Sequence, residues 1–362
     1  MTTAERIDTP SVTPSRPLRP AGRALLRIGP RIAVPIRRPT VLAAAVTLLL
    51  LLGAAVATLS MGRLGIDPAD LPSAVMGEAT GKNAFVLNRL RGPRLVVAIA
   101  AGAAFGLSGA LFQSVTRNPL GSPDVIGLSA GSGAGAAAAA LFFPDLVPVP
   151  LGALLGAVLA MSLVYVSTGT GFRNPGRLVV AGIGVAAMST ALTQYVVYAV
   201  ERDKASALTA YINGSLAARS WDDAATVWLI LLVCLPFAAL LARPLRIGEM
   251  GDDLATGLGT RPGRTATAAI TLSIVLSAGA VAVAGPIAFV SLTAPQIAKR
   301  VTRSGGPHLV MSTLLGALLL VLADLTAQQS PLFDNLPVGL YTMAVGGAYL
   351  GYLLLREWRR PA

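Results

Sequence analysis

The chain has 362 residues, of which 54% are hydrophobic and 13% charged, and its formal net charge is +12. A soluble domain carries about 25% charged residues, so this composition excludes a water-soluble globule and indicates a protein whose outer face contacts membrane lipid. A single cysteine, Cys234, and a single histidine, His308, exclude a disulfide framework and a His/Cys metal cage. We expect the positive charge to orient the protein in a membrane, with no nucleic-acid partner.

Residues 1–40 differ from the rest of the chain. They hold eight arginines against Glu5 and Asp8, are rich in proline and threonine, and lack apolar periodicity. Such a segment cannot bury enough apolar surface to fold, so we predict a disordered basic tail on the cytoplasmic side. The apolar run 41–60 that follows is long enough to span a bilayer and too long for a typical signal-peptide core. It predicts a retained first membrane helix.

Apolar stretches separated by short polar breaks follow one another from residue 41 onwards. They predict an all-α, polytopic integral membrane protein with about ten transmembrane helices over 41–362. With both termini cytoplasmic, 21 of the 29 Lys and Arg residues lie in inner segments, in agreement with the positive-inside rule. The predicted spans are 41–60, 94–113, 125–143, 149–168, 178–199, 224–242, 266–284, 288–298 (a short one), 309–327 and 337–355.

Glycine pairs four residues apart occur in several of these spans. Small residues at this spacing let helix backbones approach closely in lipid, where water expulsion does not drive association. We predict close helix packing at these pairs and also at the glycines of 131–135, where no strand precedes the motif as a dinucleotide fingerprint would require. The pairs are Gly102 and Gly106, Gly152 and Gly156, and Gly347 and Gly351.

The stretch 77–82 (GEATGK) bears only a faint likeness to a phosphate-binding loop. It has three residues between its glycines instead of four, and Asn83 stands where a Ser or Thr would bind magnesium. It is also predicted to face the outer side. The chain therefore has no visible means of binding ATP, and energy for active transport would come from a partner or from an ion gradient.

The break between the second and third spans reads RNPLGSPD, residues 117–124. Two prolines and a glycine end one helix and begin the next within a few residues. Asp124 then lies near a helix start, where the positive end of the helix dipole stabilises a carboxylate. The break predicts a tight hairpin on the inner side, and we take Asn118 and Pro119 as candidate gate residues.

The inner loop 245–264 is the longest between spans. Glu249, Asp252 and Asp253 belong to what reads as a short acidic helix, and Gly259 ends it before Pro262 forces a turn. A small cytoplasmic helix with a defined stop is suited to docking another protein. The alternative is a solvated linker.

Arg91 and Arg94, with Arg89 beside them, lie on the predicted outer side, where the positive-inside rule disfavours basic residues. Either they snorkel from the top of the second span, or they receive an acidic partner that charge complementarity steers into register. We favour the partner.

Asp324 is the clearest carboxylate within a predicted span. Such a group is costly in hydrocarbon and should face the bundle interior or a water path, either as a structural hydrogen-bond partner or in transport. Helix breaks provide further candidates, because broken helices need protein or water around them. These gate elements, or re-entrant corners, are Gly285, Pro286, Pro295, Pro337 and Gly339.

Four blocks of sequence, taken together and in order, resemble the permease family of vitamin B12 and ferric-siderophore ABC importers, the type II importers. They are 91–94 (RGPR), 108–127 (SGALFQSVTRNPLGSPDVIG), 285–300 (GPIAFVSLTAPQIAKR) and 336–347 (LPVGLYTMAVGG). The resemblance extends from about Arg89 to the C-terminus. Within this family, LRIGEMGDD at 245–253 and ADLTAQQ at 323–329 are most similar to a ferric-enterobactin permease subunit.

The resemblance implies ten helices per subunit, a core of two permease subunits, two cytoplasmic ATPase subunits and an extracytoplasmic siderophore-binding protein. Similarity favours a homologous second permease, and so a heterodimer. The loop 249–264 would bind an ATPase, and Arg91 and Arg94 would pair with glutamates of the binding protein. Two positions depart from the family pattern: Gln296 stands where His is common, and Gln328 where some relatives have a third outer arginine.

These features predict a permease subunit of an ABC importer that moves a ferric siderophore across the cytoplasmic (inner) membrane of a bacterium by ATP-driven alternating access. We expect a non-catalytic, multi-pass subunit without a cofactor. An ion-coupled secondary transporter that uses Asp324 as a proton or sodium site is the alternative. Vitamin B12 or haem as cargo and an identical second permease also stay open.

Overall fold

The computed structural model describes residues 24–28, 32–62, 64–144, 146–169, 175–199, 202–330 and 336–358. Within these residues the chain is helical apart from one antiparallel hairpin that precedes the first long helix. The elements are β1 (Ala24–Ile28), β2 (Ile32–Ile36), α1 (Arg38–Ser60), α2 (Leu71–Ser73), η1 (Ala74–Glu78), α3 (Gly81–Phe85), η2 (Val86–Leu90), α4 (Gly92–Thr116), α5 (Leu128–Phe142), α6 (Val149–Ser167), α7 (Pro175–Ala199), α8 (Arg202–Ile212), α9 (Trp221–Gly248), α10 (Asp252–Gly257), α11 (Pro262–Ala284), α12 (Val290–Thr302), α13 (Leu309–Gln329) and α14 (Val338–Trp358).

Each predicted span coincides with one helix: α1, α4, α5, α6, α7, α9, α11, α12, α13 and α14 in turn. Among the described residues, seven helices are long and apolar enough to cross a membrane. The prediction of an all-α polytopic membrane protein is confirmed, whereas the count of ten spans stays a prediction. With 15 and 13 residues, α5 and α12 extend only about 20 Å, less than the hydrocarbon core of about 30 Å.

The hairpin and the start of α1 lie within the stretch that the sequence assigns to the basic tail. Residues Ala24 to Ile28 pair with Ile36 to Ile32, and α1 begins at Arg38. Residues 1–23, the larger part of the predicted tail, lie outside the described residues.

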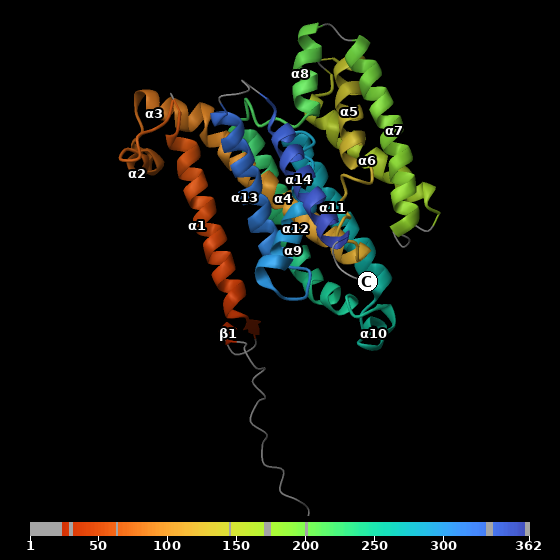
Figure 1. Cartoon of the computed structure of the whole chain (residues 1–362). Coiled ribbons are helices and arrows are strands. Elements are labelled where there is room, and N and C mark those ends of the chain that lie inside the picture. Colours follow the sequence, from red (N-terminus) through yellow and green to blue (C-terminus); the bar gives the residue numbers. More distant parts are fainter. Residues whose placement is uncertain are drawn as a thin grey trace, which may run out of the picture.

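The two ends of the bundle are distinct (Figure 1). At one end lie β1, α10 and the last turn of α14, and at the other lie α2, α3 and α8. From the predicted orientation we call these the inner and the outer end. The first long helix therefore begins on the side where the last one ends, as an even number of spans requires. Both termini on the cytoplasmic side stays a prediction, which the distribution of Lys and Arg favours.

Helix α4 forms the centre of the bundle and packs against α9, α11, α12 and α13. Its glycines make this possible: a Cβ on Gly102 would lie 2.5 Å from the carbonyl O of Gly316, and one on Gly106 would lie 2.1 Å from that of Ser312. The predicted close packing is therefore confirmed between α4 and α13. At Gly347 and Gly351 of α14 it is wrong within the chain, because no described atom lies within 4 Å of a Cβ there.

Helices α5, α6, α7 and α8 form a second group beside this centre (Figure 1). Gly152 and Gly156 of α6 lie against α5, where a Cβ on Gly135 would be 2.2 Å from the carbonyl O of Gly152. Gly156 likewise lies against Gly131, which confirms packing as the role of these motifs. The outward faces are apolar, with Val180 73% and Leu240 74% exposed, as expected of helices in contact with lipid.

Candidate functional site

The short helix α10 lies at the end of the molecule that also holds β1 (Figure 1). Gly251 precedes it at φ +107° and Gly259 follows it at φ +80°, backbone conformations that favour glycine. Beyond it, the N–H of Thr260 donates to the carbonyl O of Ala255 at 3.0 Å, the long-range bond of a Schellman cap. The predicted short helix with a glycine stop is present, although α9 continues to Gly248 and so takes up the start of the predicted loop.

Apolar side chains share the surface of α10 with the predicted acidic ones. Leu254 within α10 and Leu258 at its C-terminal end are 62% and 61% exposed and, four residues apart, lie on one face. Met250, which precedes the helix, is 64% exposed. Asp252 and Asp253 lie in the first turn, where the positive helix end favours carboxylates. An exposed apolar stripe beside acidic residues has the composition of a protein-docking surface, in which an apolar centre is bordered by polar groups.

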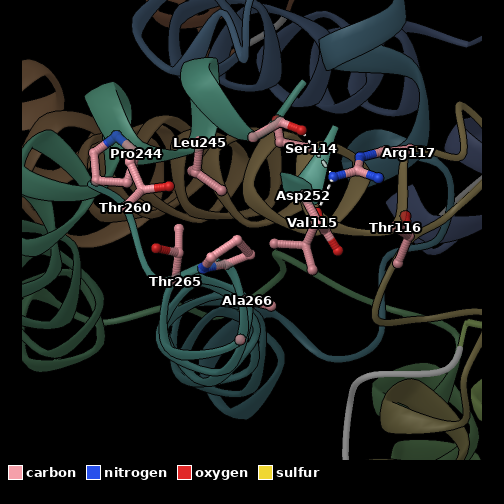
Figure 2. A pocket seen from close by; sticks show the side chains of 13 residues that line it. Ser114, Val115, Thr116, Arg117, Pro244, Leu245, Asp252, Thr260, Thr265 and Ala266 are labelled. Carbon is pink, nitrogen blue, oxygen red and sulfur yellow. Dashed lines mark hydrogen bonds and ion pairs between the residues drawn. The ribbon is translucent and has the colours of Figure 1, made fainter. Parts of the chain in front are cut away.

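Arg117 connects α10 to the rest of the inner end (Figure 2). Its Nη2 donates to the carbonyl O of Gly248, the last residue of α9, at 2.8 Å, and also pairs with Asp252. A cavity of about 480 Å³ between the ends of α4 and α9 and the start of α11 lies beside the pair. The two side chains are 48% and 67% exposed, so the ion pair contributes at most about 1 kcal/mol. Its main effect is to define where α10 lies.

Asn118 and Pro119, predicted gate residues, form the turn after Arg117. The Oδ1 of Asn118 accepts from the N–H of Leu120 at 2.9 Å, as in an Asx turn. The carbonyl O of Pro119 accepts from Gln296 Nε2 at 3.0 Å, and the same nitrogen lies 2.6 Å from Gln113 Oε1. Gln296, at the position that departs from the family pattern, thus joins α12 to this turn and to α4.

Pro295 interrupts the hydrogen bonding of α12. It has no N–H to donate to the carbonyl O of Ser291, and that oxygen lies against Gly109 of α4, where a Cβ would be 1.7 Å away. Gln113 Nε2 donates to the neighbouring carbonyl O of Leu292 at 3.0 Å. The break is therefore enclosed by protein, which is how interrupted helices are tolerated inside a membrane.

Arg91 is buried at the start of the second span, with 8% of its surface exposed. Its Nη1 donates to the carbonyl oxygens of Thr58 at 2.8 Å and Leu59 at 3.3 Å, and to that of Met61. These are carbonyls at the C-terminal end of α1, where partial negative charge attracts a cation. The guanidinium is thus engaged within the chain, whereas Arg89 beside it is exposed.

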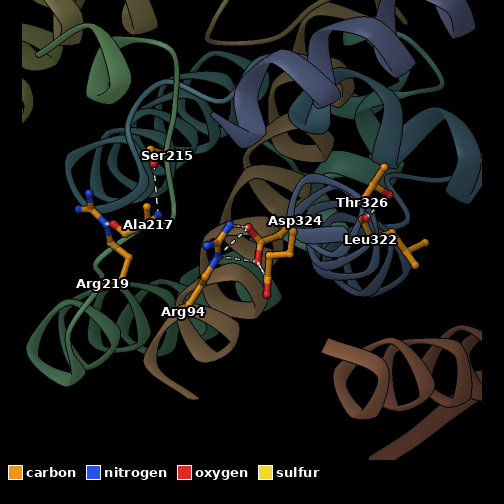
Figure 3. Close-up of polar contacts among 8 residues, drawn as sticks. Arg94, Ser215, Ala217, Arg219, Leu322, Asp324 and Thr326 are labelled. Atoms are coloured by element: carbon orange, nitrogen blue, oxygen red, sulfur yellow. Dashed lines mark hydrogen bonds and ion pairs between the residues drawn. The ribbon is translucent and has the colours of Figure 1, made fainter. Parts of the chain in front are cut away.

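Arg94 forms a bidentate ion pair with Asp324 of α13 (Figure 3). Its Nε lies 3.0 Å from both carboxylate oxygens and its Nη2 lies 2.7 Å from Oδ1. Gln328 Nε2 donates to Oδ2 at 2.7 Å. The side chains of Asp324 and Arg94 are 1% and 23% exposed. Asp324 is therefore a structural partner that joins α13 to α4, and nothing in this geometry supports a proton or sodium site there.

A basic cavity of about 380 Å³ opens beside this pair at the outer end. Arg89, Arg91 and Arg94 line it, together with Gln328 and Ser215. Only Arg94 among these arginines is paired with a carboxylate among the described residues. The cavity therefore carries net positive charge and suits an acidic group.

Gly285 and Pro286 lie against the loop between α8 and α9. Gly285 ends α11 at φ +74°, and a Cβ on it would lie 3.0 Å from the Cα of Gly214. A Cβ on Gly214 would in turn lie 2.5 Å from the carbonyl O of Pro286. No side chain fits between these backbones, so the break after α11 is fixed in place by the loop.

Pro337 and Gly339 bring the start of α14 to the same loop. The N–H of Gly339 donates to the carbonyl O of Gly214 at 3.0 Å, and a Cβ on Gly339 would lie 1.9 Å from the carbonyl O of Asn213. Pro337 directly precedes α14. We name the contact among Gly214, Gly285 and Gly339 the outer glycine contact. It brings together predicted gate residues from two breaks that lie far apart in the sequence.

Several features of the site are missing from the sequence prediction. The apolar stripe of α10 had a readable signal, namely apolar residues every four positions within an acidic loop. The loop around Gly214 had none, because its importance comes from contacts with α11 and α14. The same holds for the hydrogen bond from Ser291 to Asp124.

An apolar outer surface, interrupted helices inside the bundle and distinct polar contacts at its two ends define a multi-pass helical membrane protein. In the part of the chain that the structure describes, no group of three or more His, Cys, Asp or Glu side chains could hold a metal ion.

The chain belongs to the FecCD transport family, which matches residues 48–356. It is similar to the ferric enterobactin transport system permease protein FepG of Escherichia coli (strain K12), with 38% identity over 87% of this chain and 97% of FepG. The achromobactin transport system permease protein CbrC of Dickeya dadantii (strain 3937) is 34% identical over 90% and 95% of the two chains. The Fe(3+)-citrate import system permease protein YfmE of Bacillus subtilis (strain 168) is 33% identical over 90% and 97%.

Among solved structures, the fold matches a chain of a metal-chelate-type ABC transporter in an inward-facing conformation. The TM-score is 0.75 at 26% identity, over 86% of this chain and 98% of the other. The family and the apolar helices together identify a multi-pass transport permease of the bacterial inner membrane.

Proposed function

We propose that the chain is one permease subunit of an ABC importer that moves a ferric siderophore into the cytoplasm by ATP-driven alternating access. Relatives named for ferric enterobactin, achromobactin and ferric citrate support an iron chelate as cargo. The observation that carries the proposal is the exposed apolar stripe on α10, because a permease without its own ATP site needs a surface through which a separate motor acts. An ion-coupled carrier has no need of such a surface.

An ATPase subunit binds α10 on the cytoplasmic side in this proposal. Leu254 and Leu258 insert as apolar anchors, since buried apolar anchors dominate most interfaces. Glu249 and Asp253 border them and select a basic rim on the ATPase. The complete importer contains two ATPase subunits and a second, homologous permease, and the chelate passes between the two permeases.

An extracytoplasmic binding protein docks at the basic outer cavity. Arg89 and the exposed part of Arg94 attract its glutamates, while Arg91 fixes the end of α1 beside them. Binding there delivers the chelate to the outer end of the path, and ATP binding then closes the ATPases and moves α10.

Uptake of labelled ferric siderophores by a deletion strain, with and without the complementing gene, tests the cargo. The same assay with a partner ATPase whose phosphate-loop lysine is replaced tests the energy source. We expect uptake only when both proteins are intact. Uptake that survives loss of ATP hydrolysis and stops when the proton gradient is collapsed would establish the ion-coupled transporter instead.

A further inference from the structure

Asp124, in the loop between α4 and α5, bridges the starts of two short helices. Its Oδ1 accepts a hydrogen bond from Ser129 Oγ at 2.9 Å, and its Oδ2 accepts one from Ser291 Oγ. Ser129 is the second residue of α5, and Ser291 is the second residue of α12. One carboxylate therefore holds together two helices that begin inside the bundle and lie far apart in the sequence.

Asp124 is held by hydroxyl groups and has no cation as a partner among the described residues. The two residues that precede α5 and α12, Gly127 and Phe289, provide no side-chain cap, and Asp124 binds a hydroxyl in the first turn of each helix. Neither of the ion pairs among the described residues involves Asp124. Each oxygen of the carboxyl group bonds one serine hydroxyl, whereas the amide of Asn has only one acceptor oxygen and would lose one of the two bonds.

The loop that carries Asp124 is attached to α10 at its other end. Arg117 begins the loop and binds both the end of α9 and Asp252 of α10. Helix α12 contacts the loop twice, through Ser291 on Asp124 and through Gln296 on the carbonyl O of Pro119. A displacement of α10 together with the adjoining end of α9, which Arg117 also binds, is therefore passed to the loop and, through two separate contacts, to α12.

The N-terminal end of α12, where Ser291 binds Asp124, also leads directly to the outer glycine contact. Phe289 precedes the helix at φ +69°, and a Cβ on Gly346 of α14 would lie 2.2 Å from the Cβ of Phe289. Only residues 286–288 separate Phe289 from Gly285 of the outer glycine contact. Asp124 therefore binds the same end of α12 that adjoins residues 286–289, so a displacement of its loop acts directly on this segment.

We propose that Asp124 is a positioning residue that transmits the movement of α10, through the start of α12, to the outer glycine contact. The proposal rests on the function proposed above, in which an ATPase moves α10. In it, Asp124 touches neither the chelate nor ATP; it fixes α12 to the loop so that hydrolysis and opening of the path stay coupled.

The test uses the complete importer, with both permeases, the ATPases and the binding protein, reconstituted in lipid vesicles. The D124N variant keeps the shape of the side chain and replaces one of its two oxygens with an amide group. We expect assembly and basal ATP hydrolysis to be retained and the number of chelate molecules transported per ATP hydrolysed to fall about tenfold, a typical size for coupling between sites. S291A should lower this ratio in the same direction. S162A is the matched control, because Ser162 bonds only the carbonyl O of Val158 in its own helix.

The exchanged variant D124S/S291D distinguishes transmission from a general loss of fold, because it keeps a carboxylate and a hydroxyl at the joint. Recovery of the transport ratio above that of D124N supports the proposal. A wild-type ratio in both D124N and S291A, or an exchanged variant that hydrolyses ATP but transports no better than D124N, would overturn it. A wild-type importer without ATP-dependent uptake would refute the proposed function itself, so the two failures are distinguishable.

Discussion

The outer arginines and the inner helix α10 both have the composition of docking surfaces, yet the structure uses them in opposite ways. At the outer end, Arg91 is bound to carbonyls of α1 and Arg94 to Asp324. At the inner end, Leu254 of α10 and Leu258, the residue after this helix, are 62% and 61% exposed. The outer surface is thus largely committed to holding helices together, while the inner one is available for binding.

The difference follows from where the charges lie. An ion pair with one side chain 1% exposed cannot exchange its partner for water without a large cost, whereas the pair of Arg117 and Asp252 at the surface can. An acidic partner at the outer end must therefore use charge that remains after the internal pairs are made. A partner at the inner end gains mainly by covering apolar side chains.

The largest expected effect is the loss of ATPase binding in L254E/L258E. Two anchor positions at about 2 kcal/mol each correspond to binding weakened about 1000-fold, and uptake should fall to background. Thermal stability should not change, because both side chains are exposed. Co-purification with the ATPase and uptake measure the result. T256E adds a charge on another face of α10 and should retain binding; equal loss in T256E would mean that the stripe is not the docking surface.

The next effect is on stability and compares the two ion pairs directly. D324N should destabilise the protein by about 3 kcal/mol, because it leaves the Arg94 guanidinium without its carboxylate in a largely buried site. D252N should cost at most about 1 kcal/mol, since its pair with Arg117 is exposed. Unfolding in detergent measures both. Similar losses in the two variants would contradict the contrast between the ends.

A charge exchange, R94D/D324R, separates the structural role of the outer pair from a role in docking. The exchanged pair should keep stability within about 1.5 kcal/mol of the wild type, while binding of the binding protein should weaken about tenfold because the exposed cation has moved. Unfolding and a direct binding assay give the two readings. Unchanged docking in a folded variant would remove Arg94 from the docking surface.

The smallest effect is a pH dependence at His308, in the connection between α12 and α13. Burial lowers the pKa of His308 from its usual 6.5, and the charge of Lys299 lowers this pKa further. The hydrogen bond to Ser304 acts in the opposite direction and raises it. As the pH falls below about 6.5 the unfolded chain takes up the proton first, so stability present above that pH is lost on acidification. Unfolding in detergent across pH 5 to 8 measures this loss. H308N should remove this loss, because Asn does not titrate between pH 5 and 8, and it should fold because Asn tolerates the positive φ of this residue. A loss that persists in H308N would assign the pH dependence to another group.

Part of the candidate site could be predicted from short stretches of sequence. Gly251, Gly259 and the acidic first turn define α10 because glycine and helix-dipole effects act within a few residues. The positions of Gly285 and Pro286 likewise mark a break. The sequence around Gly285 and Pro286 could not indicate that this break contacts Gly214 and Gly339, because backbone contacts across the bundle produce no periodic pattern in the sequence.

The sequence by itself determined that the chain is a many-helix membrane bundle with a short, glycine-bounded helix at its inner end, because the length and apolarity that a bilayer demands are local properties of each segment. Only the tertiary structure decided what the sparse charges do. The partners Arg94 and Asp324 are 230 residues apart, and Asp124 and Ser291 are 167 apart. Such pairs form because close packing of α4, α5, α12 and α13 brings their polar groups together where no water is available to satisfy them.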